Sequence, residues 1–297
     1  VNGVPAISRA MRTYENCGID KHLIIIGKGA GQLVETVGSE FSNVAYVYQK
    51  EQLGTANALR CLKSGLSFLP DDAELLIVAG DRLVDQTILE RFFTEYFSKK
   101  ADFAVLALKC AEKSGQGRIF CDNHGRPAAI IEMADIKQRK TYEILRKLAE
   151  KNQLPDKQNI LQIIKENFFG STEELSNEKK AKAAEAFAKI WQILDSDKKI
   201  CSAEFLDLVS QEDTYFEFML DEGKQALSPD EAKNLPYGNT SVYLLKYKVL
   251  KAALAKLDRD NAQQEEYLSD LPKIIYQNAL LNNKKPNLFV HKSDDSN

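Results

Sequence analysis

The first third of the chain alternates between helical apolar spacing and short, almost continuous apolar runs. Segment 5–19 places Ile7, Ala10, Met11 and Tyr14 on one helical face, and an apolar run over 22–27 follows it directly. The same pattern predicts further helices over 31–38, 55–66 and 86–99, and strands over 44–48, 75–80 and 102–108. Because strands without polar alternation are buried on both faces, this order predicts an α/β fold with a parallel sheet covered by helices on both sides.

Later segments add antiparallel character to the predicted sheet. Two strand-like runs in 118–132 flank Asn123 to Arg126, with Gly125 between them, which is typical of a hairpin. Further strands are expected over 239–245 and 287–291, and further helices over 248–257 and 267–281. The predicted sheet is therefore mixed and mostly parallel.

The stretch between these two regions has a different texture. Residues 135–235 carry many charges and helical apolar spacing, with no strand pattern, so we expect a helical insertion there. The predicted division is a first core region over residues 1–134, the insertion over 135–235 and a second core region over 236–297. One insertion helix carries an apolar face that must pack somewhere, made of Phe187, Ile190, Trp191 and Leu194.

Composition excludes several classes of protein. The 297 residues carry a net charge of −3, so no basic face is expected to hold a nucleic acid. No apolar run approaches the roughly 20 residues that span a bilayer. The five cysteines are scattered and never form a CxxC pair, which favours reduced thiols and a cytoplasmic location. We therefore expect neither a nucleic acid nor a membrane as partner.

The stretch "QLGTANAL" (52–59) follows a predicted strand with a run of small residues. Gly54 has no side chain, so its backbone can approach a flat ligand closely, and the amide of Gln49 offers both a donor and an acceptor. The alternative is an ordinary turn at a helix start. Asp81 ends another predicted strand, at the carboxyl edge where open α/β sheets bind ligands, and the alternative for it is a loop cap.

Six motifs resemble, in order, those of the sugar-1-phosphate nucleotidyltransferases, and most closely the N-acetylglucosamine-1-phosphate uridylyltransferase (UDP-N-acetylglucosamine pyrophosphorylase) domain. They are "YQKEQLGTANAL", "LLIVAGD", "GQGRIF", "AAIIE", "GNTSVYLL" and "NAQQEEYLSD". The resemblance implies the Rossmann-like fold of nucleotide-diphospho-sugar transferases. It also implies that UTP and a sugar 1-phosphate react to give a UDP-sugar and pyrophosphate, with Mg²⁺ as cofactor.

The resemblance assigns roles to particular residues. It implies that the first core region binds the nucleotide through Gln49, Gln52, Gly54 and Thr55, and that Asp81 is the catalytic residue and the metal ligand. It implies that the second core region completes a sugar pocket, whose residues are Gly117, Glu132, Asn239, Glu265, Tyr267 and Ser269.

The chain also departs from the family pattern. The family opens with a strand and a glycine-rich loop with its Lys, which would precede Val1, so we expect an incomplete fragment with poor activity of its own. In "EEYLSD", Glu266 stands where the family has Tyr. These departures leave two alternatives open: a catalytically silent module that binds a nucleotide sugar, and an assembly scaffold that forms a homo-oligomer through the insertion.

Overall fold

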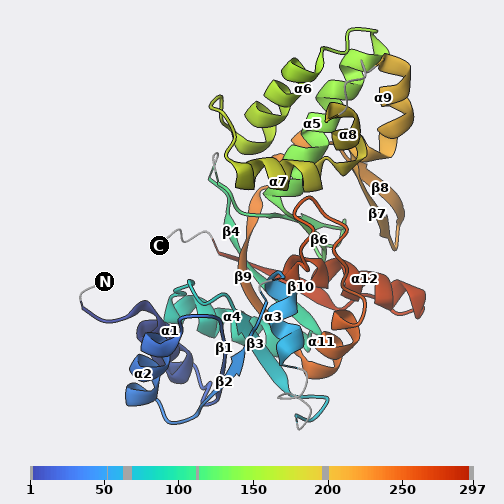
Figure 1. Cartoon of the computed structure of the whole chain (residues 1–297). Coiled ribbons are helices and arrows are strands. Elements are labelled where there is room, and N and C mark those ends of the chain that lie inside the picture. Colours follow the sequence, from blue (N-terminus) through green and yellow to red (C-terminus); the bar gives the residue numbers. More distant parts are fainter. Residues whose placement is uncertain (1–2, 52, 63–68, 112–113, 196–200, 294–297) are drawn as a thin grey trace.

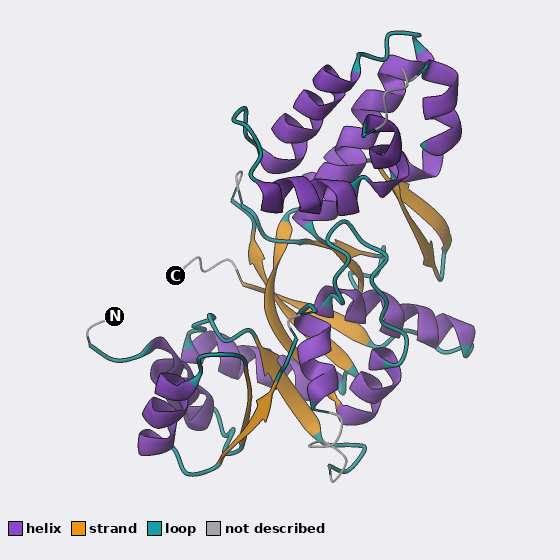
Figure 2. Ribbon diagram, in the orientation of Figure 1, coloured by secondary structure: helices purple, strands orange, loops and turns teal. Residues whose placement is uncertain are grey.

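The computed structural model describes residues 3–51, 53–62, 69–111, 114–195 and 201–293. A central sheet is flanked by helices, and a mostly helical group stands at one end of it (Figures 1 and 2). The α/β class predicted from the sequence is confirmed. Among the described residues, none of the helices is long and apolar enough to cross a membrane.

The main sheet contains six described strands, in the order β10–β4–β9–β5–β6, with β3 also paired to β9. Their bounds are β3 Glu74–Val78, β4 Phe103–Lys109, β5 Arg118–Cys121, β6 Pro127–Ile131, β9 Tyr237–Lys246 and β10 Leu288–Ser293. The pairings make β3, β4, β5 and β10 run in one direction, and β9 and β6 in the other. The sheet is therefore mixed with mostly co-directed strands, and β5 and β6 form the predicted hairpin.

Helices cover both faces of this sheet, as expected. Successive residues of a strand point to opposite faces, so Phe103 and Val105 join one apolar cluster and Ala104 and Leu106 join another. One cluster includes residues of α3 (Thr55–Cys61), α11 (Tyr247–Leu254) and α12 (Leu271–Leu281), which follows the short turn η3 (Leu268–Asp270). The other includes residues of α4 (Gln86–Lys99).

The first two described strands form a separate parallel pair. Strands β1 (His22–Ile26) and β2 (Val44–Tyr48) pack with α1 (Ala6–Asn16) and α2 (Gly31–Glu40) through a small apolar cluster. Within the described residues, β1 has β2 as its one strand partner and β3 has β9 as its own. The strands predicted from the first third of the chain therefore form, but they belong to two sheets.

The insertion has its own core, as Figure 1 shows at the top of the view. Its apolar cluster is built from α5, α6, α7, α8 and α9 and the residues that join them. The element bounds are α5 Met133–Glu150, α6 Lys157–Ile164, a π-helical turn η1 Lys165–Phe169, α7 Asn177–Ala186, α8 Ala188–Leu194, α9 Ser202–Leu208, η2 Gln211–Thr214, β7 Phe216–Leu220, β8 Gly223–Leu227 and α10 Pro229–Lys233.

The expectation that 135–235 contains no strand is wrong, because β7 and β8 form an antiparallel hairpin there. Phe216, Phe218 and Leu220 are buried while the residues between them are exposed, which is the period-two pattern of a half-buried strand. Phe218 stacks on Phe120 of β5 with ring centroids 4.6 Å apart. The hairpin therefore packs on the main core and fixes the end of the insertion to it.

The apolar face predicted over 187–194 is buried within the insertion. The predicted helix is broken at Phe187 (φ −113°, ψ 32°), and Phe187, Ile190 and Leu194 lie in the insertion cluster, with Trp191 partly buried against it. This face is therefore already occupied by its own chain. The homo-oligomer through the insertion stays a prediction.

Candidate functional site

Gly54 lies where two motifs from distant regions of the sequence meet. It precedes α3 with φ +111°, and a Cβ placed on it would lie 2.5 Å from the backbone oxygen of Glu266 and 2.7 Å from its nitrogen. The amide of Ala56 donates to the carbonyl of Glu266 at 2.9 Å, and the amide of Leu268 donates to the hydroxyl of Thr55 at 3.0 Å. Both the helix-start conformation and this close contact require a glycine here, whereas its contact with a base stays a prediction.

Gln49 is oriented by Asn57, a residue of the small-residue motif 52–59 that was not among the predicted site residues. It follows β2, its amide nitrogen donates to the side-chain oxygen of Asn57 at 3.1 Å, and Asn57 lies in the first turns of α3. The side chain of Gln49 is thereby held against the helix that starts at the small-residue loop. Gln52, the fourth predicted nucleotide-binding residue, lies outside the described residues.

Three of the predicted sugar-binding residues, Gly117, Glu132 and Asn239, meet near the N-terminal end of β9. The carboxyl group of Glu132 lies over Gly117, where a Cβ would come within 2.9 Å of it. The amide of Asn239 donates to the carbonyl of Gly117 at 2.9 Å, and the Asn239 side chain is hydrogen-bonded to the hydroxyl of Tyr243 and accepts from the amide of Ser241. Ser241 has φ +60°, so β9 holds a non-glycine residue in the left-handed region where its pairing with β4 is irregular.

The carboxyl groups on this side of the site have raised pKa values. Burial raises the pKa of Glu132, and the hydroxyl of Ser269 offsets part of this rise. Burial, with the charge of Glu132 adding to it, raises the pKa of Asp135 to about 6, and burial raises that of Asp270 to about 7. Burial is also the largest cause of the raised pKa of Tyr267, followed by the charges of these carboxylates. Burial therefore favours the protonated forms of these groups, and perturbed pKa values of this kind can mark a functional site.

Segment 261–269 contacts both the loop around Gly54 and the carboxyl groups around Glu132. Asn261 shapes it, because its side-chain oxygen accepts from the amides of Gln263 and Glu265 and its side-chain nitrogen donates to the carbonyl of Glu265 at 2.6 Å. The hydroxyl of Tyr267 donates to Gln263 at 2.7 Å, and the side chain of Tyr267 is buried. The amide of Ala262 donates to Asp135. Glu265, Tyr267 and Ser269 thus lie on one organised segment, and their contact with a sugar stays a prediction.

Asp81 lies at the carboxyl end of β3, where it is exposed. The last backbone link of β3 is the amide of Ala79 donating to the carbonyl of Ser241 at 3.3 Å, so Asp81 follows two residues beyond this link, at the same end of the sheet as Asn239. Its side chain is 80% exposed, and the Arg82 guanidinium is 3.8 Å away. This carboxylate is exposed to solvent beside Arg82, and its role as a metal ligand stays a prediction.

Another acidic group, formed by Asp122, Asp221 and Glu222, brings three ligand atoms within 4.8 Å of one another. Arg126 pairs with two of its members, because its Nε lies 2.6 Å from Asp122 and a second nitrogen lies 2.5 Å from Asp221. The hydroxyl of Tyr276 also donates to Asp122 at 2.8 Å. This network of ion pairs and hydrogen bonds joins the β5–β6 turn, the β7–β8 turn and α12, and we assign it to the stability of the fold.

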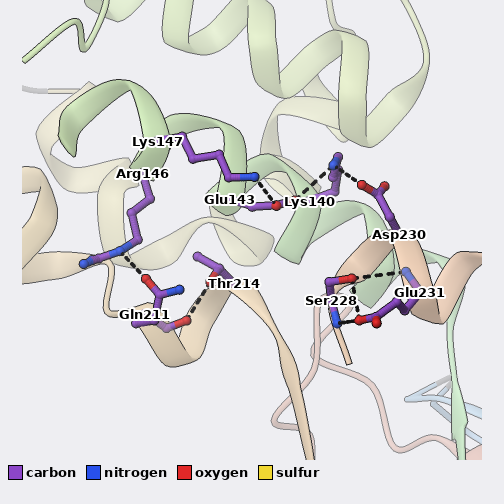
Figure 3. A network of polar contacts seen from close by, with 9 residues as sticks. All are labelled: Lys140, Glu143, Arg146, Lys147, Gln211, Thr214, Ser228, Asp230 and Glu231. Carbon is purple, nitrogen blue, oxygen red and sulfur yellow. Dashed lines mark hydrogen bonds and ion pairs between the residues drawn. The ribbon is translucent and has the colours of Figure 1, made fainter. Parts of the chain in front are cut away.

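The insertion contains a hollow of about 290 Å³ between α5, η2, β8 and α10. The charged groups in it and beside it bind one another (Figure 3): Lys140 contacts Asp230 and Glu143, Lys147 contacts Glu143, and Arg146 donates to Gln211. Because these charges are already paired, we assign the network to the stability of the insertion.

Known proteins are similar to this chain in sequence and in fold. It is 31% identical over 147 residues to the bifunctional protein GlmU of Syntrophomonas wolfei, and 32% identical over 136 residues to that of Staphylococcus saprophyticus. The resemblance read from the motifs is confirmed. These matches cover 48% and 46% of this chain, and the chain spans about a third of the length of each relative (32% and 29%). No protein-family model matches the chain.

A solved structure agrees on the fold. A protein assigned as a glucose-1-phosphate thymidylyltransferase from Bacillus anthracis, solved in complex with sucrose, aligns with a TM-score of 0.50 over 98% of this chain and 74% of its own. The sequences are 14% identical, so this match supports the fold alone. Mixed α/β architecture of the nucleotidyltransferase type is thus common to both.

Proposed function

We propose that this chain is the core of a nucleotidyltransferase that joins UTP and a sugar 1-phosphate, in particular N-acetylglucosamine 1-phosphate, to give a UDP-sugar and pyrophosphate. The observation that carries the proposal is the contact of the motif around Gly54 with segment 261–269, which continues to Ser269 beside Glu132. Motifs more than 200 residues apart in sequence thereby lie side by side, which supports their use as one site. The GlmU relatives support the same class of reaction.

In this proposal the nucleotide lies against the loop before α3. The Gln49 amide, oriented by Asn57, binds the imide edge of uracil, and the backbone around Gly54 and Thr55 supports the base. Gln52 belongs to the same loop. Reading of one base edge by a fixed amide gives a preference for uridine over purine nucleotides, because a purine presents a different pattern of donors and acceptors.

The sugar is placed on the other half of the site. Glu132 accepts hydrogen bonds from sugar hydroxyls, and Asn239 and the backbone at Gly117 bind the acetamido group and ring. Glu265, Tyr267 and Ser269 line the same pocket from segment 261–269. The inward side chain of Asn239 is already fixed by Tyr243, which limits the entropy lost on binding.

Asp81 is the proposed ligand for Mg²⁺, which prefers carboxylate, phosphate and water oxygens. The exposed carboxylate at the strand end fits this role, since a hydrated cation needs one or two protein ligands and room for water. When bound, the cation neutralises charge on the phosphoryl oxygens.

The proposed chemistry is an in-line displacement at the α-phosphorus of UTP. A phosphomonoester has a second pKa of about 6, so its attacking oxygen is already largely ionised at neutral pH and no general base is needed. The protein then acts mainly by holding the two substrates in line. We place the reaction in the cytoplasm, with UTP and the sugar 1-phosphate as partners.

Calorimetry and a pyrophosphate-release assay on the full-length protein test this function. We expect tighter binding of UTP than of ATP, and Gln49→Ala should weaken UTP binding by about 1 to 3 kcal/mol because an imide is left unpaired. Asp81→Asn should lower turnover far more than nucleotide affinity. Equal affinity for ATP and UTP contradicts the proposed base reading, and binding of UDP-sugar without pyrophosphate release supports the silent module instead.

A further inference from the structure

Helix α3 and the residues just before it are joined to segment 261–269 by four hydrogen bonds. Three involve the backbone: Glu266 donates to the carbonyl of Leu53 at 3.1 Å, Ala56 donates to the carbonyl of Glu266, and Leu268 donates to the Thr55 hydroxyl. The fourth joins side chains, since Arg60 Nε donates to Glu266 Oε2 at 2.7 Å. The base-reading loop therefore cannot shift without moving this segment.

The Arg60–Glu266 ion pair is partly shielded from water. The Glu266 side chain is 13% exposed and that of Arg60 is 35% exposed. The same guanidinium donates to the carbonyl of Leu257 at 2.9 Å, and the guanidinium of Arg259 lies 3.9 Å from the other Glu266 oxygen. Charge-assisted bonds of this kind are stronger than neutral ones and fix orientation. Arg60 thus holds α3, segment 261–269 and the chain after α11 in one arrangement.

Segment 261–269 connects Glu266 to the proposed sugar half of the site, which includes Glu132 and Ser269. Its Asn261 and Tyr267 contacts make it a compact loop, and Ser269 at its end lies beside the carboxyl group of Glu132. If α3 shifts and moves Glu266 with it, Ser269, three residues later in the same segment, must therefore move as well. In the family motif a Tyr stands at the position of Glu266, so the ion pair is a feature by which this chain departs from that pattern.

We propose that Arg60 and Glu266 are positioning residues that couple the nucleotide half of the site to its sugar half. Neither side chain contacts a substrate in this proposal. Their ion pair keeps the loop before α3 and the Ser269 end of segment 261–269 in the relative position that a ligand occupying both halves needs. The inference rests on the proposed function, because it names the two halves by their ligands.

The test compares ligands that occupy one half or both halves. Calorimetry measures the affinity of UMP, which fills the nucleotide half, and of UDP-N-acetylglucosamine, which fills both. Arg60→Gln should weaken the binding of UDP-N-acetylglucosamine about 10-fold and that of UMP less than about 2-fold, and Arg60→Lys, which keeps the charge, should recover most of the loss. Arg12→Gln is the matched control, since it breaks the Arg12–Glu40 ion pair (2.8 Å) on α1 and α2.

Equal weakening of both ligands by Arg60→Gln, or no weakening of either, overturns the coupling. Hydrogen exchange gives a second readout that needs no ligand: the amides of Glu266 and Leu268 should exchange at least about 10-fold faster in Arg60→Gln and unchanged in Arg12→Gln. Unchanged exchange at these amides also overturns the proposal. If the wild-type protein binds neither ligand, the proposed function is wrong, and the exchange result alone decides whether the ion pair fixes the segment.

Discussion

Replacing Gly54 by Ala tests the contact that brings the two motifs together. The residue combines φ +111° with ψ 170°, a region populated almost only by glycine. Its Cβ would lie 2.5 Å from the Glu266 oxygen and 2.7 Å from the Glu266 nitrogen, both of which are backbone atoms that cannot rotate away. Alanine must therefore push segment 261–269 outward or distort the start of α3.

The expected cost can be worked out from these two effects. The backbone conformation costs about 1 to 3 kcal/mol for a residue with a Cβ, and the steric overlap costs about another 1 to 3 kcal/mol. The lower entropy of an unfolded chain with Ala returns about 0.4 to 1 kcal/mol. We expect Gly54→Ala to lower the free energy of unfolding by about 1 to 5.6 kcal/mol.

Urea denaturation followed by circular dichroism measures this loss. Gly29→Ala is the matched control, because Gly29 also has a positive φ (+84°) but a Cβ there would meet no atom within 4 Å. The control should cost about 1 kcal/mol, the conformational contribution alone. If Gly54→Ala and Gly29→Ala unfold at the same free energy, the close approach of Glu266 is not what requires the glycine.

Three further substitutions test the surroundings of the site. Asp270→Asn should flatten the pH dependence of unfolding: the folded-state pKa of Asp270 is raised to about 7, so the wild type loses stability as the pH rises from about 4 to 7, and an unaltered slope in urea titrations contradicts this. Ser241→Gly should raise the free energy of unfolding by about 0.5 kcal/mol, since glycine adopts φ +60° without steric cost, and a measured loss of stability would show that the serine itself is needed. Arg126→Met should cost about 3 to 5 kcal/mol by leaving the buried Asp122 carboxylate without its cation, and recovery of that stability by added Mg²⁺ would instead identify a metal site.

Much of the core was predictable from the sequence because its signals are local. Apolar runs such as 103–108 are long enough to indicate buried strands, and the β5–β6 hairpin is marked by Gly125 at its turn. The insertion was visible as a change of texture, but its hairpin was missed. The five residues of β7 alternate in burial, yet such a short pattern is hidden among the helical segments around it.

For the candidate site, by contrast, the motifs indicated which residues belong to it but not how those residues are arranged in space. Motif order pointed to Gly54, Glu132, Asn239 and Ser269, and the structure brings the last three to one end of β9. Asn57, Asn261 and Asp135 orient or anchor these residues. Asn57 and Asn261 lie inside the matched motifs, but none of the three was among the predicted site residues.

The reason is physical. Periodicity and turn chemistry act between residues a few positions apart, so the sequence by itself determined the elements and the class of site. The contact of Gly54 with Glu266, the ion pair of Arg60 and the raised pKa of Asp270 each depend on segments far apart along the chain. Burial and close approach exist only once those segments are packed, so the tertiary structure alone decided which residues touch and which carboxyl groups have raised pKa values.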